Sequence, residues 1–422
     1  MSICHPLRLL TVIGLLPLFG VTSFAGLAGP SDSEQPTNSG TAPNLFIGED
    51  VKWGGVLFPH AHFNTVYGTT GLEGGHELAA GHHDPVEDGW TVQGIELGLS
   101  ARVDEHLEAF GNWHGFWGNE SPHDFDSEFE EYFVKLKNLP GGMELRGGRY
   151  LNRFGLHNAT HLHGWDWVDN YLVNGRFLGD DGQYSTGLEA TWNLPVSWTS
   201  ALSISAGRAK VEEHVHEEGE AEKEFLYEAE GAAFGHTLVV ANWTNVWNVN
   251  DFHQWRFGAS GAWGDNLWDR RTQVLGAHVQ YEWRKNGFAP GGNHFRWRTE
   301  VMRRDVDAKS GHLEGEEEHE VHDDEPVSGS FDEWGLYTST VYGKSLGRGV
   351  IEGGLRYEYV AGVEDAGLVE RHRISPGLTW YANRLRSAWL RVQGNFDDIA
   401  GAGRESSVWL GFGVNWGGPE VR

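Results

Sequence analysis

The sequence predicts an all-β fold, a transmembrane antiparallel β-barrel with about 16 strands. From about residue 55 onward, the chain is a series of segments of roughly 10 to 14 residues in which apolar and polar residues alternate. After residue 25, no segment stays apolar for the roughly 20 residues that a membrane-spanning helix requires. The connections between the segments are alternately short and long. Together these observations indicate strands that cross a bilayer.

The alternation is clear in segment 408–416. Its apolar side chains fall on one face: Val408, Leu410, Phe412, Val414 and Trp416. Successive side chains of a strand point to opposite faces, so this segment has one apolar face and one small or polar face. A soluble β-sandwich would show the same pattern. Segment lengths close to the roughly 9 to 11 residues that cross a bilayer, and aromatic residues at the segment ends, favour the barrel.

The lengths of the connections predict which end of each strand faces outward. Connections after even-numbered strands are short, as at 104–106 and 139–142. Several connections after odd-numbered strands are long, namely 68–90, 156–183, 213–235 and 308–332. Outer-membrane barrels have short periplasmic turns and longer external loops. We therefore expect the long segments on the external side.

The first residues predict export to the outer membrane of a Gram-negative type of cell. Arg8 precedes an apolar run, 9–21, of about 13 residues, and residues 23–25 match a signal cleavage site. A buried helix of a cytosolic protein is the alternative for this run. Cys4 is the only cysteine, so the mature chain would contain no thiol. The expected organisation is a signal peptide at 1–25, a flexible leader at 26–44 and an outer-membrane β-barrel at 45–422.

The composition limits the classes of partner. The formal net charge is −28, which disfavours nucleic acid and favours cations. The 20 Trp, 21 Phe and 12 Tyr suit aromatic belts at the membrane interfaces. Expected partners are outer-membrane lipid and lipopolysaccharide, the outer-membrane assembly machinery, and small solutes or divalent cations, with a homotrimer as a candidate assembly. We expect no enzyme, because no Gly-x-Ser-x-Gly motif and no Ser, His and acid set stand out.

Three of the external loops combine histidines with acidic residues. Imidazole nitrogens and carboxylate oxygens suit zinc, copper or nickel and need no thiol. The alternative is a solvated, charged loop with no ligand. We expect no required cofactor, but weak binding of a divalent metal such as zinc. The candidate metal ligands in these loops are His76, His82, His83, His214, His216, His312, His319 and His322.

The third external loop, 156–183, is long and aromatic, which predicts that it folds into the barrel. Exposure to water would otherwise leave its large side chains unburied, namely Trp165, Trp167, Tyr171 and Phe177. Inside the lumen, the loop would form a constriction or a small metal site. The candidates for that site are His161, His163, Asp166 and Asp169. Packing and hydrogen bonding in the lumen is the alternative role for these side chains, and the one that we favour.

The faces of the strands opposite the apolar side carry charges of both signs. Buried charges must pair or contact water, so this predicts a polar lumen. A hydrated pore and a closed, salt-bridged lumen are the two interpretations. The expected pore-lining residues are Arg146, Arg296, Arg298, Glu300, Arg356, Glu358 and Arg391.

The third-loop region, 149–192, also carries short motifs. They include Arg-Phe-Gly at 153–155, His-x-His at 161–163, Trp-x-x-Val-Asp at 165–169 and Phe-Leu-Gly-x-x-Gly at 177–182. With these, the chain resembles poorly characterised porin-like outer-membrane β-barrel proteins, which are broadly similar to phosphate-selective porins and often labelled zinc-regulated outer-membrane protein. The resemblance implies that the third loop is the constriction. The acidic loops fit phosphate poorly, so we do not carry over anion specificity.

The leading hypothesis is a porin-like channel in the outer membrane for passive diffusion of small solutes or ions. Its external loops would gather divalent cations such as zinc. The alternative is a surface metal-binding or adhesion protein with a closed barrel lumen. A TonB-dependent receptor would need about 22 strands and a plug, for which the chain is too short.

Overall fold

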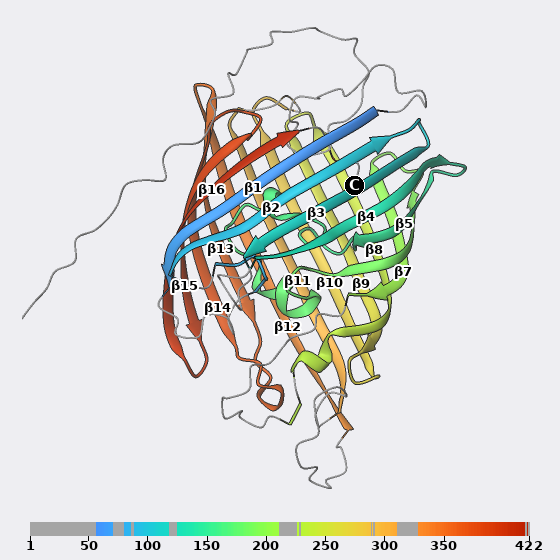
Figure 1. Ribbon diagram of the computed structural model, residues 1–422, viewed down its shortest axis with the longest axis vertical. Coiled ribbons are helices and arrows are strands. Elements are labelled where there is room, and N and C mark those ends of the chain that lie inside the picture. The colour runs from blue at the N-terminus through green and yellow to red at the C-terminus, as the bar shows by residue number, and fades with distance from the viewer. Residues whose placement is uncertain are drawn as a thin grey trace, which may run out of the picture. The chain divides into compact units, whose positions relative to one another are not determined.

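The computed structural model describes residues 56–70, 80–85, 88–117, 125–210, 226–227, 229–287, 289, 292–309, 328–417 and 420. Within these residues, 16 strands form a closed antiparallel barrel in which each strand pairs with the next and β16 pairs with β1 (Figure 1). The prediction of the fold class is therefore confirmed. The predicted signal peptide and leader fall outside the described residues, and the first described strand begins at Val56.

The strands follow one another around the barrel in sequence order. Their bounds are β1 Val56–Thr70, β2 Gly89–Arg102, β3 Leu107–Trp117, β4 Phe125–Leu139, β5 Met143–Leu151, β6 Tyr184–Asn193, β7 Thr199–Ala209, β8 Phe234–Asn250, β9 His253–Asn266, β10 Arg271–Arg284, β11 His294–Lys309, β12 Ser328–Leu346, β13 Gly349–Val360, β14 Arg371–Tyr381, β15 Ala388–Ile399 and β16 Gly403–Gly417. The short helices are η2 Leu162–Gly164, α1 Leu172–Leu178, η3 Ala229–Ala232 and η4 Glu364–Ala366. No helix among the described residues is long and apolar enough to span a membrane.

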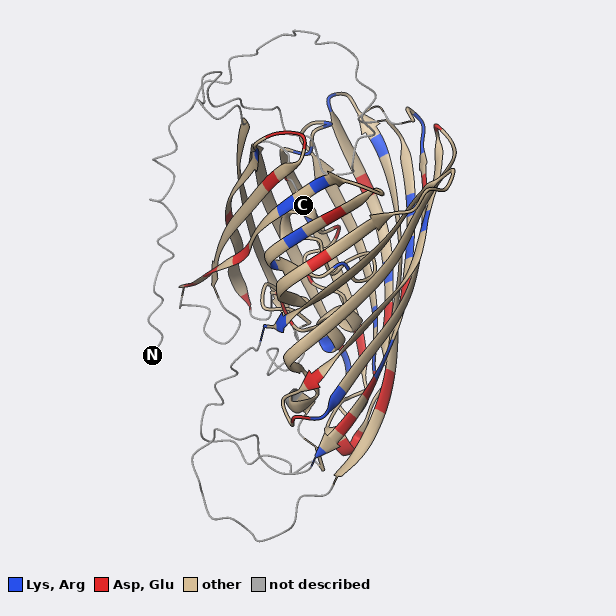
Figure 2. Ribbon diagram, turned by 90° about the vertical axis from the view of Figure 1, so that its right-hand side faces the viewer, with Lys and Arg blue, Asp and Glu red and all other residues tan. Residues whose placement is uncertain are grey.

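The outer face of the barrel is apolar, as the alternation predicts. On β16, the exposed side chains are Val408, Leu410, Phe412, Val414 and Trp416. The residues between them point inward, because neighbouring side chains of a strand lie on opposite faces. Lys, Arg, Asp and Glu residues also occur along the strands (Figure 2). A barrel with this outer face buries apolar side chains against lipid tails rather than in a second sheet.

The connections after even-numbered strands are short turns, as predicted from the sequence. Strands β4 and β12 start earlier than the alternation indicates, at Phe125 and Ser328. The β11–β12 ladder continues to the pair Lys309 and Ser328, because backbone hydrogen bonds do not need apolar side chains. Much of the long connections at 213–235 and 308–332 lies outside the described residues.

The barrel closes where β1 pairs with β16, from His60 opposite Gly417 to Thr70 opposite Ser407. Gly417 has a φ of +118°, a backbone conformation that favours glycine. A Cβ atom at this position would lie 2.2 Å from the carbonyl oxygen of Pro59. Glycine therefore lets the chain leave β16 in close contact with β1.

The connection between β5 and β6, residues 152–183, is here called the inserted segment. It contains η2 and α1, and its side chains pack inside the barrel. Trp167, Tyr171 and Phe177 are each no more than 3% exposed. They belong to one core cluster with inward-facing residues of the wall, such as Val274 and Met302. The predicted insertion of the third loop is confirmed, because burial inside the barrel removes these aromatic rings from water.

Candidate functional site

One side of the lumen is lined by carboxylates of β2 and β4, which we call the acid wall: Glu96, Glu130 and Glu131. Glu130 and Glu131 are adjacent in sequence, yet they are only 6% and 0% exposed. A shift of register between Asn112 and Trp113 of β3 explains this, since Glu131 pairs with Asn112 and Phe129 pairs with Trp113. The extra residue is a β-bulge, which turns two successive side chains inward.

The histidines of the inserted segment contact the acid wall. His161 Nε2 donates to Glu131 Oε2 at 2.8 Å, and His161 Nδ1 accepts from the amide of Asn112 at 3.1 Å. His163 Nδ1 donates to Glu96 Oε2 at 2.7 Å. Both ring nitrogens of His161 are thus hydrogen-bonded, one to the acid wall and one to Asn112 of β3. The other ring nitrogen of His163, Nε2, faces Glu420 instead of the acid wall.

The next residues of the inserted segment, 165–169, contact arginines of β11 and of β13 to β15. We call these residues the arginine wall: Arg296, Arg298, Arg356, Arg373 and Arg391. Arg356 Nη2 and Arg373 Nη1 donate to the two oxygens of Asp169 at 2.7 and 2.9 Å. Asp166 accepts from Arg296 and, at 3.0 Å, from Arg298. Arg391 donates to the backbone carbonyls of Trp165 and Trp167.

These contacts decide the charge of the two aspartates. Burial raises the pKa of Asp169, but the guanidinium groups of Arg356 and Arg373 outweigh it and hold that pKa below its usual range. The pKa of Asp166 is likewise lowered, because Arg296 and Arg298 outweigh burial. Both carboxylates are therefore ionised and bound to arginines. The structure separates them from His161 and His163, with which the sequence grouped them.

The predicted pore-lining residues divide into two sets. Five are buried in contacts with the wall or the inserted segment, namely Arg146, Glu300, Arg356, Glu358 and Arg391. Arg146, for example, donates to Glu189 at 2.8 Å, and Glu358 accepts from the backbone N–H of Leu172 at 2.8 Å. The side chains of Arg296 and Arg298 keep 12% and 22% exposure. Among the seven predicted residues, these two arginines are the ones that remain partly exposed.

Two of the predicted loop ligands, His82 and His83, lie next to the inserted segment. His82 Nδ1 is 3.3 Å and His83 Nε2 is 3.5 Å from the carboxylate of Asp181. Burial, with a smaller contribution from His114, lowers the pKa of His83 to about 3, so this imidazole is neutral. The other loop candidates lie outside the described residues, namely His76, His214, His216, His312, His319 and His322.

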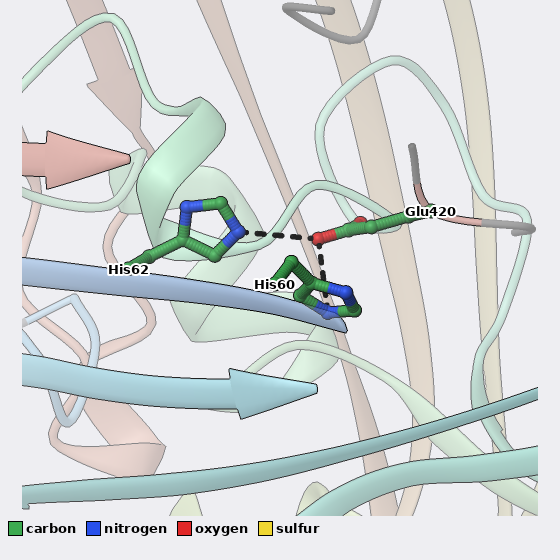
Figure 3. Close-up of side chains that lie close together, drawn as sticks. All are labelled: His60, His62 and Glu420. Carbon is green, nitrogen blue, oxygen red and sulfur yellow. Dashed lines mark ion pairs between the residues drawn. The ribbon is translucent and has the colours of Figure 1, made fainter. Parts of the chain in front are cut away.

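The structure also brings together residues that the sequence did not single out. His60 and His62 of β1 point at Glu420, which follows β16 (Figure 3). Among the described residues, two groups of three donors are close enough to hold a metal ion: His60 with His62 and Glu420, and Glu96 with His161 and His163. The pattern His-x-His in β1 was a usable signal, because residues two apart share a face of a strand. Glu420 had no such signal.

No family model matches the chain. A stretch of 126 residues is 29% identical to an uncharacterized protein of Aquifex aeolicus (strain VF5); it covers 29% of this chain and 24% of that protein. The chain therefore matches about a quarter of the length of this curated relative.

Solved outer-membrane channels share the fold. The outer membrane channel DcaP of Acinetobacter baumannii is 14% identical with a TM-score of 0.50, over 87% of this chain and 99% of that one. OprB of Pseudomonas putida is 10% identical with a TM-score of 0.50, over 90% and 100% of the two chains. At these identities the likeness shows the fold, a closed 16-stranded outer-membrane barrel, and no more.

Proposed function

We propose that the protein is a passive channel of the outer membrane for small solutes or ions, and not an enzyme. The observation that carries the proposal is the two-sided barrel, apolar outside and charged inside. A lumen lined by ionisable side chains stays hydrated where these side chains are not fully paired. Arg296 and Arg298 lie on that inner face and are partly exposed. The outer membrane, with its lipid and lipopolysaccharide, is the proposed location.

The external loops extend this proposal to divalent cations. The sequence between β7 and β8 and between β11 and β12 contains the histidines and acids predicted as weak zinc ligands, among them His214, His216 and His319. Imidazole and carboxylate groups bind zinc, and a local concentration of them raises the number of cations near the entrance. The chain itself needs no cofactor in this proposal.

A second candidate function is a surface metal-binding or adhesion protein with a closed lumen. The observation in its favour is the inserted segment, whose Trp167, Tyr171 and Phe177 pack against the wall inside the barrel. The buried pairs of Arg356 with Asp169 and of Arg146 with Glu189 add to this filling of the lumen. This candidate predicts no ion flow.

Planar-bilayer recording on the refolded full-length protein separates the two candidates. We expect stepwise conductance, with an ion selectivity that changes when zinc is added on the side of the external loops. The control is the variant with His214, His216, His312, His319 and His322 replaced by Ala, which should conduct but respond less to zinc. A folded barrel, verified by its heat-modifiable migration, that never conducts would contradict the channel and leave the closed-lumen protein.

A further inference from the structure

We propose a binding site for one divalent transition-metal ion, such as zinc, inside the barrel, with four ligands: His60, His62, His163 and Glu420. It does not depend on the channel function proposed above. His60 and His62 lie on β1, His163 lies in η2 of the inserted segment, and Glu420 lies after β16. None of the external loop histidines belongs to it.

The distances in this cluster match those between ligands of one metal ion. Glu420 Oε1 lies 3.6 Å from His60 Nε2 and 3.6 Å from His62 Nε2 (Figure 3). The same oxygen lies 3.3 Å from His163 Nε2. Zinc binds nitrogen and oxygen at about 2.0 to 2.2 Å, so two ligands of a tetrahedral site are about 3.3 to 3.6 Å apart. Three imidazole nitrogens thus lie around one carboxylate oxygen at the spacing between ligands of one ion. The rings of His62 and His163 are stacked, with centroids 3.7 Å apart and planes at 8°, so one ring must turn for both nitrogens to reach the same ion.

The tautomer of His62 is fixed by its second nitrogen. His62 Nδ1 lies 3.1 Å from Asn415 Oδ1. The amide nitrogen of Asn415 donates to the carbonyl of Arg386 at 3.2 Å, which sets the orientation of the amide. Asn415 Oδ1 can only accept, so His62 Nδ1 must be the donor. When the ring is neutral, the lone pair is on Nε2, the atom that faces Glu420.

The tautomer of His163 is fixed in the same way. His163 Nδ1 donates to Glu96 Oε2 at 2.7 Å, and Glu96 is 1% exposed. A buried carboxylate that accepts from the far nitrogen of a histidine is a common outer partner of metal ligands, because it orients the ring and makes its other nitrogen more basic. Asn415 and Glu96 are therefore positioning residues for His62 and His163.

His60 supplies a third nitrogen that the rest of the described structure leaves without a hydrogen bond. Its ring is 3% exposed and stacks on Phe110, with centroids 5.6 Å apart and planes at 7°. Neither of its ring nitrogens has a hydrogen-bond partner among the described residues. The same holds for His278 of β10, so what distinguishes His60 is that its Nε2 atom also faces Glu420 and His62, where a ligand would satisfy it.

The donor set selects the class of ion. Three imidazoles and one carboxylate suit zinc, copper, nickel or cobalt, whereas calcium and magnesium prefer oxygen ligands throughout. When His62 and His163 are neutral, their Nε2 lone pairs face the Glu420 oxygen, and a cation between them removes that repulsion. The rival arrangement without metal has protonated rings that pair directly with Glu420.

Zinc calorimetry tests the site in full-length protein whose five histidines at 214, 216, 312, 319 and 322 are replaced by Ala. We expect about one tight zinc site per chain in this background. Adding His62→Ala or Glu420→Gln should remove it. The matched control is His278→Ala, another buried luminal histidine, on β10, which belongs to neither donor group and should leave binding unchanged. Binding that is absent from the background, or equal in all variants, would overturn the proposal without affecting the channel.

Two further measurements test the site without replacing a ligand, in case a ligand variant fails to fold. Asn415→Ala leaves all four ligands in place, and we expect zinc affinity about 10- to 100-fold weaker because His62 loses its orientation. The background protein loaded with Co²⁺ should show the strong visible absorption of a tetrahedral site. A weak octahedral spectrum, or an Asn415→Ala affinity equal to that of the background, would favour the protonated cluster and contradict the metal site.

Discussion

The acid wall and the arginine wall bind opposite ends of one short stretch of chain. His161 and His163 contact carboxylates of β2 and β4, while Asp166 and Asp169 contact arginines of β11, β13 and β14. Residues 161–169 of the inserted segment thus contact two parts of the barrel wall, each of complementary charge. The order of histidines and aspartates along residues 161–169 matches the order of the two walls that they contact. The four residues that the sequence groups together thus contact two different walls.

Replacing Asp169 should cause the largest loss of stability if the arginine wall holds the inserted segment more strongly than the acid wall does. Asp169→Ala removes the carboxylate that Arg356 and Arg373 share, and each arginine keeps one other carboxylate partner, so we expect a loss of about 3 kcal/mol of stability, the lower end of the range for a broken buried pair. The measurement is the free energy of unfolding in denaturant, followed by tryptophan fluorescence. Asp305→Ala is the control, because its pair with Arg303 is exposed on the outer face and contributes at most about 1 kcal/mol. Equal losses in both variants would show that the arginine wall is not an anchor.

Replacing His161, which contacts the acid wall, should cause an intermediate loss of stability. His161→Ala removes a charge-assisted hydrogen bond to Glu131, and we expect a loss of about 1.5 to 3 kcal/mol in the same unfolding experiment. Glu131 keeps its bond from the backbone N–H of Leu151, which limits the loss. His161→Gln retains a donor and should recover part of it. A loss larger than that of Asp169→Ala would reverse the order of the two anchors.

The smallest effect on stability is expected at Arg298. Its side chain is 22% exposed, and Asp166 keeps Arg296 as a partner, so Arg298→Ala should cost less than about 1 kcal/mol. Removing this positive charge should instead shift the selectivity of the channel toward cations, measured as reversal potential in a salt gradient. Arg303→Ala, on the outer face, should leave the reversal potential unchanged. A large loss of stability at Arg298 without any shift would place it in a closed part of the lumen.

The sequence predicted the barrel well, because alternation and turn lengths are local signals. The exposed face of β16 follows from the alternation, and the burial of Trp167 and Phe177 follows from the aromatic content of a long loop. The partners of Asp166 and Asp169 could not be predicted, because they depend on which strands the inserted segment meets inside the barrel. The bulge that turns both Glu130 and Glu131 inward breaks the alternation itself. Glu420 lies beyond the last alternating segment, so no pattern placed it near His60.

The long reach of the inserted segment affects the order in which the barrel assembles. Asp169 hydrogen-bonds to Arg356 and Asn395, which follow it by 187 and 226 residues. If the chain folds from its first strand onward, the arginine partners of Asp166 and Asp169 are absent until the later strands join the sheet. The inserted segment stays without these contacts until then. Contacts of such high sequence separation form late and slowly. Docking of the segment and closure of the β1–β16 seam are therefore expected to be coupled final steps of folding.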